Sequence, residues 1–299
     1  MIGLTQLHYF KALAERQHLT KTANYLMISP PSLSSTISRL EHELGCQLFQ
    51  REGRNLYLND FGRIYLKYVN QIFNALDNAK AELNDAASKK DCCLSLAISS
   101  PVIWHKSLQA FIKSNPDICL SHTLLNFNDP KEVFTTYSQF DFIMTATSDV
   151  LKADWDYEIL IPDDRPVLAV SPSHPLANRK SIRLIEAKDE NFIAVSKGFS
   201  MRKYFEDSCN LAGFSPKIVL ECDYALRSVM LAAGYGIVFT TKFGVQNGSL
   251  TNAVFIDIDD PPLKRTQAIF TNKSRYLSSA AKTFRDFMIK FYHTPDFGW

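Results

Sequence analysis

The stretch TKTANYLMISPPSLSSTISRLEHELG, residues 20–45, decides how the first part of this chain folds. Its apolar residues recur at helical spacing on both sides of a tight Ser-Pro-Pro turn, which predicts two short amphipathic helices. Thr20 is expected to cap the first helix, and Ala23, Leu26 and Met27 are expected to form its inward face. A short helix, a tight turn and a second helix make a unit that fits the major groove of DNA.

The second helix of this unit has one apolar face and one hydroxyl-rich face. Pro31 suits its first turn, and Gly45 follows as its C-terminal cap. The apolar residues repeat every three or four positions and are expected to be buried: Leu33, Ile37, Leu40 and Leu44. The opposite face is small and polar, so it can approach a phosphate backbone closely; it carries Ser32, Ser34, Ser35, Ser38 and Arg39.

A basic hairpin is expected beside this unit. Residues 4–15 have the spacing of a preceding helix, and residues 48–58 have the pattern of two short strands with Gly53 in the turn. Arg51 and Arg54 lie near the tip of that hairpin. A hairpin with basic residues beside a helix-turn-helix is typical of a wing, which contacts the minor groove or the DNA backbone.

A long amphipathic helix is expected next, capped by Asn59 or Asp60. Its apolar side chains form a seam like that of a coiled coil, so we expect two chains to dimerise along it. The alternative is that the seam packs onto the second domain of the same chain. The seam residues are Phe61, Ile64, Tyr65, Tyr68, Ile72, Leu76, Ala79 and Leu83.

Residues 84–91 are small and polar, which indicates a linker or hinge. After them, strands and helices alternate to the end of the chain, which predicts a parallel sheet with crossover helices. Helices are expected at 101–114, 130–139, 181–187, 200–212, 225–233 and 278–292, and strands at 93–98, 118–125, 142–145, 192–195, 217–221, 236–240, 254–258 and 267–271, with further strands within 157–171.

Composition narrows the function classes. The chain has 299 residues and a net charge of +2, so it is long enough for two or three domains of ~100–200 residues each and is not polybasic overall. Charged residues near the start, such as Lys11 and Glu15, exclude the apolar core of a signal peptide, and no apolar run reaches the ~18 residues of a membrane helix. We therefore expect a cytoplasmic protein without a membrane partner, whose six cysteines are free thiols.

At the level of motifs, the first 66 residues resemble the LysR-type transcriptional regulators. The most specific part runs from Leu40-Glu41 through Leu44-Gly45 to Leu48-Phe49-Gln50-Arg51. Looser matches follow in His174-Pro175-Leu176-Ala177 and in residues 232–237. The resemblance implies an α/β protein with an all-α winged helix-turn-helix N-terminal domain, a long linker helix and a two-lobed effector domain like the periplasmic binding proteins.

The family plan implies three domains in this chain. They are a DNA-binding domain at 1–59, a linker helix and hinge at 60–91, and an effector-binding domain at 92–299. In the last, lobe I is expected at 92–161 and 268–299, and lobe II at 162–267. The expected partners are promoter DNA, a small-molecule effector and further copies of the chain, as a homodimer to homotetramer. The residues expected to contact DNA are Thr20, Ser32, Ser34, Ser35, Thr36, Arg39, Arg51 and Arg54.

Two positions depart from the family pattern. The family often has Gln before the recognition-helix proline, where this chain has Pro30, and Arg after the helix serine, where this chain has Ser35. Losing an amide and a guanidinium removes direct base readers worth ~1–3 kcal/mol each. The DNA site is therefore expected to differ from the usual half-site or to be read more through DNA shape.

The family resemblance implies that two strand-to-helix turns face one cleft, and the effector site is expected there. Ser99-Ser100-Pro101 opens one helix and Phe199-Ser200 opens another, and free N–H groups at such helix starts favour an anion or a carbonyl. A small organic anion is the expected effector, and a neutral or aromatic molecule is the alternative. The residues expected to line the cleft are Ser99, Ser100, Trp104, Thr145, Phe199, Ser200 and Asp223; for each of them, capping or core packing is the alternative.

Three other functions are alternatives to an effector-controlled transcriptional regulator. Peroxide-sensing members of the family have a cysteine at the turn occupied here by Phe199-Ser200, which leaves only Cys209 and Cys222 for a redox regulator. A cytoplasmic solute-binding protein with a helical N-terminal fusion does not explain the wing arginines. An enzyme of binding-protein-like fold is disfavoured because no nucleophile, paired carboxylate or metal-ligand spacing is present; no catalytic residue, metal or cofactor is expected.

Overall fold

The computed structural model describes residues 2–52, 55–87, 92–127, 133, 136–149, 155–248, 250 and 252–294. These residues form two compact units, Met1–Leu83 with Ser274–Tyr276 and Asn84–Lys273 with Leu277–Trp299. Within the described part of the chain, no helix is both long enough and apolar enough to span a bilayer.

The first unit begins with three helices and a hairpin around a small apolar core. The helices are α1 (Leu4–Arg16), α2 (Leu19–Tyr25) and α3 (Pro30–Leu44), and β1 (Phe49–Glu52) pairs antiparallel with β2 (Asn55–Leu58). The core side chains come from all of these elements, and they include Phe10, Leu13, Ala23, Leu33, Leu40 and Leu48. This confirms the helix-turn-helix and the apolar face of its second helix.

The start of each of the two helices differs from the sequence prediction. The cap of α2 is His18, whose Nδ1 accepts a hydrogen bond from the Lys21 amide at 3.3 Å, so Thr20 lies inside the first turn and is exposed. Met27 was expected to face inward but is 93% exposed, because the chain turns there with a positive φ of 56°. Helix α3 starts at Pro30 rather than Pro31, with Ser29 as its cap.

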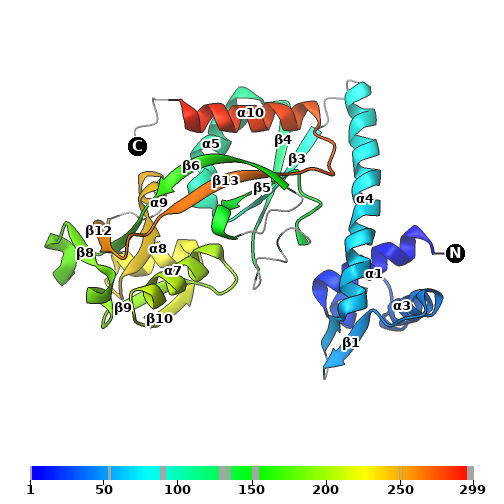
Figure 1. Cartoon of the computed structure of the whole chain (residues 1–299), viewed down its shortest axis with the longest axis horizontal. Helices are drawn as coiled ribbons and strands as arrows, with labels where there is room; N and C mark the ends of the chain where they lie inside the picture. The colour runs from blue at the N-terminus through cyan, green and yellow to red at the C-terminus, as the bar shows by residue number, and fades with distance from the viewer. Residues whose placement is uncertain are drawn as a thin grey trace. The chain divides into compact units, whose positions relative to one another are not determined.

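Helix α4 (Asp60–Ala86) is one continuous helix, drawn in cyan in Figure 1. Asn59 caps it by accepting a hydrogen bond from the Gly62 amide at 2.9 Å. Gly62 is required there, since a Cβ would lie 2.1 Å from the Leu48 carbonyl oxygen. The helix continues through residues 84–86 of the expected linker; residues 88–91 lie outside the described residues. Seven of the eight seam side chains are exposed: Phe61, Ile64, Tyr68, Ile72, Leu76, Ala79 and Leu83.

The second unit contains a five-stranded sheet in the order β4-β3-β5-β13-β6. Its strands are β3 (Cys92–Ile98), β4 (Ile118–Leu124), β5 (Phe142–Ala146), β6 (Trp155–Asp164) and β13 (Arg265–Asn272). Helices α5 (Pro101–Ser114) and α10 (Ser279–His293) pack against each other and against this sheet, as Figure 1 shows. Their shared core is strongly aromatic and includes Trp104, Phe111, Phe142 and Phe284.

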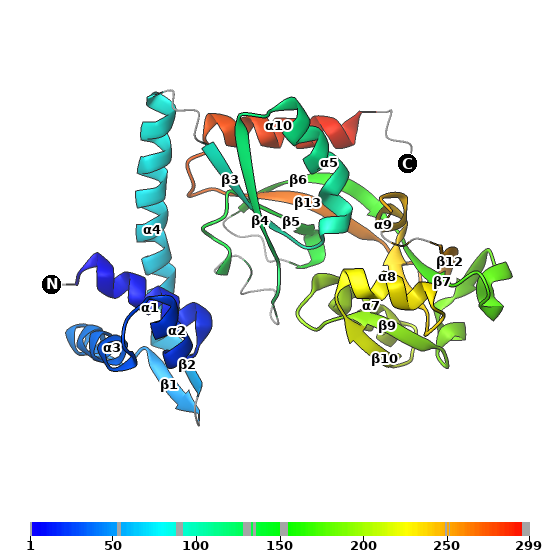
Figure 2. The same cartoon turned by 180° about the vertical axis from the view of Figure 1, so that it is seen from behind.

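A second set of strands belongs to the same unit (Figure 2). Its four-stranded sheet has the order β11-β7-β12-β8, made by β7 (Pro166–Val170), β8 (Ser181–Arg183), β11 (Val238–Thr241) and β12 (Val254–Asp260). A separate pair joins β9 (Asn191–Val195) and β10 (Lys217–Cys222), and both α7 (Ser200–Leu211) and α8 (Tyr224–Ala232) contact β9. A short helix, α9 (Lys242–Gln246), follows β11.

Two sequence predictions change in this unit, and a third is largely untested. The sheets are mixed rather than parallel, because β13 returns antiparallel between β5 and β6. Residues 181–187 are not one helix but β8 followed by a 3-10 turn, Leu184–Ala187. The helix expected at 130–139 falls largely outside the described residues.

Candidate functional site

The polar face of α3 is the candidate DNA-binding surface. Ser32, Ser35 and Arg39 are exposed, while the opposite face of the helix is buried in the core. Thr36 donates its hydroxyl hydrogen to the Ser32 carbonyl at 2.9 Å, so this hydroxyl also serves the helix itself. Ser34 is half-buried. Among the other expected contacts, Arg54 and the side chain of Arg51 lie outside the described residues.

The two predicted strand-to-helix turns meet in the second unit. Ser99 and Ser100 follow β3 and lead into α5, while Ser200 opens α7; all three are at least 95% buried. The Tyr224 hydroxyl at the start of α8 lies 3.5 Å from the Ser99 carbonyl oxygen. Between the turns lies a cavity of only ≈ 10 Å³, room for one water at most. It is lined by Ser100, Val102, Ile103, Met201, Tyr224, Arg227, Thr240, Thr241 and Gly244.

A buried carboxylate, Asp149, joins the elements around this cleft. Its Oδ2 accepts hydrogen bonds from Thr145 Oγ1 at 2.7 Å, Ser200 Oγ at 2.5 Å and Arg265 Nη2 at 2.9 Å. The same Nη2 also donates to Ser200 Oγ. Asp149 ends the 3-10 turn Thr147–Asp149 after β5, so one oxygen atom ties together β5, α7 and β13.

Arg265 has further hydrogen-bonding capacity. Its side chain is 2% exposed, yet its Nε and Nη1 donate to no group among the described residues. The guanidinium carbon lies 4.9 Å from the centre of the Tyr204 ring, which gives it a favourable cation–π contact. Two buried donors without acceptors are costly, and such donors at a cleft indicate a place for a ligand acceptor.

A second buried guanidinium, that of Arg227, lies on α8 at the cavity. Arg227 is 3% exposed and has no ion pair within the described part of the chain; its guanidinium carbon lies 5.0 Å from the centre of the Tyr224 ring. Burial lowers the pKa of this guanidinium, and no carboxylate offsets the effect. A buried positive charge without a counter-ion favours an anionic ligand.

Asp164 lies where the chain passes from one sheet to the other. It ends β6 and pairs in register with Arg265, the first residue of β13. Its Oδ1 accepts a hydrogen bond from the Phe243 amide at 3.0 Å. Burial raises the pKa of this carboxyl to about 6, because the nearby donors and Arg265 only partly offset the lost hydration.

Of the other residues expected to line the cleft, some lie beside Asp149 or Tyr224 and others lie in the core or at the start of a helix. Thr145 and Ser200 meet at Asp149, and Phe199 packs edge-on against Tyr224 with ring centres 5.9 Å apart. Trp104 is fully buried in the core under α5, where it contacts Tyr292. Asp223 caps α8 by accepting from the Leu226 amide at 2.8 Å and is exposed. Trp104 and Asp223 therefore serve the fold rather than the cavity.

Sequence reasoning missed the three charged residues of the cleft: Asp149, Arg227 and Arg265. No short motif contains them, and 116 positions separate Asp149 from Arg265 in the chain. The one local signal was an acidic residue three positions after the carboxyl end of the apolar strand 142–146.

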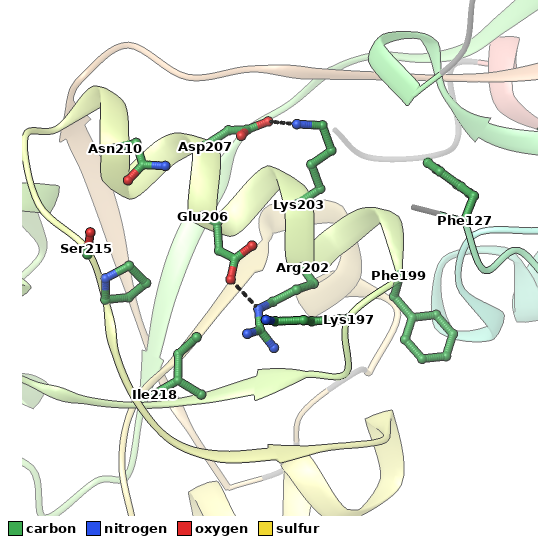
Figure 3. Close-up of a pocket in the computed structure, with 12 residues that line it drawn as sticks. Phe127, Lys197, Phe199, Arg202, Lys203, Glu206, Asp207, Asn210, Ser215 and Ile218 are labelled. Atoms are coloured by element: carbon green, nitrogen blue, oxygen red, sulfur yellow. Dashed lines mark hydrogen bonds and ion pairs between the residues drawn. The ribbon is translucent and has the colours of Figure 1, made fainter. Parts of the chain in front are cut away.

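A larger hollow of ≈ 470 Å³ lies beside the N-terminal part of α7 (Figure 3). It contains the cations Lys197, Arg202 and Lys203. Figure 3 shows Arg202 paired with Glu206 and Lys203 paired with Asp207, at 2.8 and 2.9 Å. Because carboxylates neutralise two of its three cations, this hollow attracts an anion less than the cleft does.

Comparison with known proteins identifies the chain. The pattern of bacterial regulatory helix-turn-helix proteins of the lysR family matches residues 4–63, and that of the LysR substrate binding domain matches residues 94–292. The chain belongs to the LysR family. It is thus a DNA-binding transcriptional regulator with an effector-binding domain, in a family of regulators rather than enzymes.

Relatives of this LysR-type regulator match it along nearly the whole chain. It is 29% identical to the uncharacterised HTH-type transcriptional regulator YybE of Bacillus subtilis, over 95% of this chain and 97% of that protein. It is 28% identical to the transcriptional dual regulator GltC of Bacillus subtilis, over 97% of each chain. Full-length OxyR from Pseudomonas aeruginosa shares the fold, with a TM-score of 0.65, 21% identity and coverage of 97% and 98%.

The cysteines considered for redox sensing in this LysR-type regulator are in unreactive surroundings. Burial raises the pKa of the Cys209 thiol to about 12, and burial also raises the pKa of the Cys222 thiol. Both thiols therefore stay protonated at neutral pH, and the thiolate is the reactive form. Among the described residues, no three His, Cys, Asp or Glu side chains gather in a way that would hold a metal ion.

Asp164→Asn tests the buried carboxyl at the junction between the sheets. A carboxyl whose folded pKa is raised from 3.8 to about 6 stabilises the folded state below pH ~4 and loses this contribution as pH rises through 6. The variant keeps the acceptor for the Phe243 amide and loses the titration. We expect its free energy of unfolding, relative to wild type, to increase by about 1–1.5 kcal/mol between pH 5 and 7.5. Urea unfolding at both pH values measures this difference, and an equal difference at the two values would contradict it.

Proposed function

We propose that this regulator binds promoter DNA through the polar face of α3 and the β1–β2 hairpin. The observation that supports this most is the division of α3 into a buried apolar face and an exposed face of small polar residues and Arg39. Small hydroxyl side chains allow close approach to phosphates, and the arginines provide charge-assisted hydrogen bonds. The proposed contacts are Thr20, Ser32, Ser34, Ser35, Thr36, Arg39, Arg51 and Arg54, within a DNA-binding domain at 1–59.

Two chains are proposed to dimerise along α4, within the linker segment 60–91. The seven exposed apolar side chains of the seam follow one another at helical spacing, and an apolar row of that length is unfavourable in water. Pairing of two such dimers through the effector domains would give a tetramer. Because its target is the chromosome, we propose that the assembly works in the cytoplasm.

The proposed effector is a small organic anion bound in the cleft of the domain at 92–299. Arg227 supports this proposal, because its buried guanidinium faces the cavity without a carboxylate partner. The polar groups beside it are Ser100 and Tyr224. The cavity is too small for such a molecule as it stands, so binding requires the two lobes, 92–161 with 268–299 and 162–267, to move apart.

We propose that effector binding changes how the DNA-binding pairs are spaced, and so the bend of the DNA. The ligand acts by binding one arrangement of the lobes better than the other. Such a mechanism alters the length of the DNA footprint or its hypersensitive site more than the overall affinity.

Arg39→Ala tests the DNA-binding face. Loss of one phosphate contact is expected to lower the slope of log K against log salt by about 0.9 and to weaken binding to all sequences. Electrophoretic mobility shifts at several salt concentrations measure the slope. Arg285→Ala, in the exposed pair with Asp286 on α10, is the matched control and should leave the slope unchanged. An unaltered slope for Arg39→Ala would remove this residue from the interface.

Leu76→Glu tests the α4 seam. Leu76 is 49% exposed in the single chain, and a carboxylate in an apolar interface is costly to bury. Sedimentation should show the dimer dissociating at concentrations where wild type remains associated. Asp77→Lys, which lies outside the seam on the next position of the same helix, should associate like wild type. A Leu76→Glu protein that sediments with the same assembly mass as wild type would place the dimer contact elsewhere.

Arg227→Met tests the anion site. A panel of small carboxylates is screened by thermal shift on the wild-type protein. The affinity of each compound that stabilises it is then measured for wild type and for the variant. We expect the variant to lose at least about tenfold in affinity, as for removal of a charged hydrogen bond. Arg179→Met, in the exposed pair with Glu186, is the control. Equal affinity for Arg227→Met and wild type would contradict this site.

A further inference from the structure

Asp149 makes the contacts that a bound carboxylate would make. One of its oxygens receives hydrogen bonds from a hydroxyl on β5, a hydroxyl at the first residue of α7 and the guanidinium of Arg265. A helix start, two hydroxyls and an arginine together form a site for an anion. Asp149 is 8% exposed, so its carboxylate is held in the interior of the cleft rather than at its rim.

The arginine in this arrangement is only partly used. A guanidinium offers five N–H donors, and Asp149 takes one nitrogen of Arg265, which also reaches Ser200. Nε and Nη1 of Arg265 are buried without an acceptor among the described residues. A structural ion pair would be expected to use the guanidinium in a bidentate fork, whereas a single contact leaves the arginine able to exchange one carboxylate for another.

The three groups that hold Asp149 come from two parts of the effector domain: Thr145 and Arg265 lie on strands of the five-stranded sheet, and Ser200 lies on α7. Helix α7 contacts β9, and Arg265 starts the strand that returns from β12 to the five-stranded sheet. The adjacent cavity of ≈ 10 Å³ is closed to any organic molecule. The contacts of Asp149 therefore fasten the cleft in its closed, ligand-free form.

We infer that Asp149 is an internal ligand of the cleft, and that the carboxylate of an effector takes its place on Arg265, Ser200 and Thr145. This inference rests on the proposed function, which puts the effector in this cleft. Exchange of one carboxylate for another conserves the charge on Arg265, so the guanidinium is never left alone in the interior. The displaced Asp149 no longer links β5 to α7, and the lobes are released from their closed arrangement.

The test is chemical rescue of Asp149→Ala by sodium acetate, whose carboxylate replaces the carboxylate that the substitution removes. Loss of the buried partner of Arg265 should lower the Tm by more than about 6 °C. Acetate at about ten times its dissociation constant should restore about 3–5 °C. Sodium chloride at equal ionic strength and neutral acetamide should not. Asp257→Ala, which breaks an exposed ion pair with Lys242, should show no response specific to acetate.

Asp149→Asn provides a second test of the acetate effect if the alanine variant does not fold. It retains the size of the side chain and removes its charge, so acetate should stabilise it more than it stabilises wild type. Adding Arg265→Met to either variant should abolish the acetate effect. Stabilisation by acetate that equals that by chloride, or that persists without Arg265, would overturn the inference.

DNA binding by the wild-type protein, measured beside the acetate response of the variants, distinguishes failure of this inference from failure of the proposed function. Wild-type protein that binds DNA, together with variants that ignore acetate, would overturn the role of Asp149 and leave the regulator proposal intact. Wild-type protein that binds no DNA would overturn the proposed function, while an acetate response that needs Arg265 would still support the role of Asp149.

Discussion

The contact of Asp149 with Arg265 and Ser200 is the interaction on which the arrangement of the effector domain depends. It joins a turn after β5, the first residue of α7 and the first residue of β13, and no two of these are neighbours in the chain. Charges buried this deeply stabilise a fold only when they are paired, so each side chain requires the others to stay in place. Loss of any one of them would leave a desolvated polar group in the interior.

The same constraint supports the proposal that the cleft binds an effector and is not only a junction between sheets. If only apolar side chains lay between the two sheets, their contact would be stable without a ligand. This contact instead contains two buried guanidiniums and a carboxyl with a pKa of about 6. Arg265 has one internal counter-ion and Arg227 has none among the described residues. Buried groups whose hydrogen-bonding capacity is only partly used favour a ligand that completes their contacts, which is the basis of the proposed exchange between two arrangements of the lobes.

Much of the fold was predictable because local patterns determine it. Apolar spacing located α1, α3 and α5 to within a residue or two, and the exposed row on α4 was visible as a seam. Met27 was misplaced because its positive φ ends the helical periodicity one residue before it. The antiparallel return of β13 was missed, since strand order depends on contacts between segments over 100 residues apart. For the same reason the serines of the cleft were predictable from the turns, while Asp149, Arg227 and Arg265 were not.

The most direct test of the account combines the cleft with DNA. Asp149→Ala protein is footprinted on the intergenic DNA beside its own gene, with sodium acetate or with sodium chloride of equal ionic strength. If the carboxylate on Arg265 sets the arrangement of the lobes, acetate should shift the protected length or the hypersensitive site of the variant and leave the wild-type footprint unchanged. Identical footprints of the variant in the two salts, with acetate binding established by thermal shift, would contradict the account.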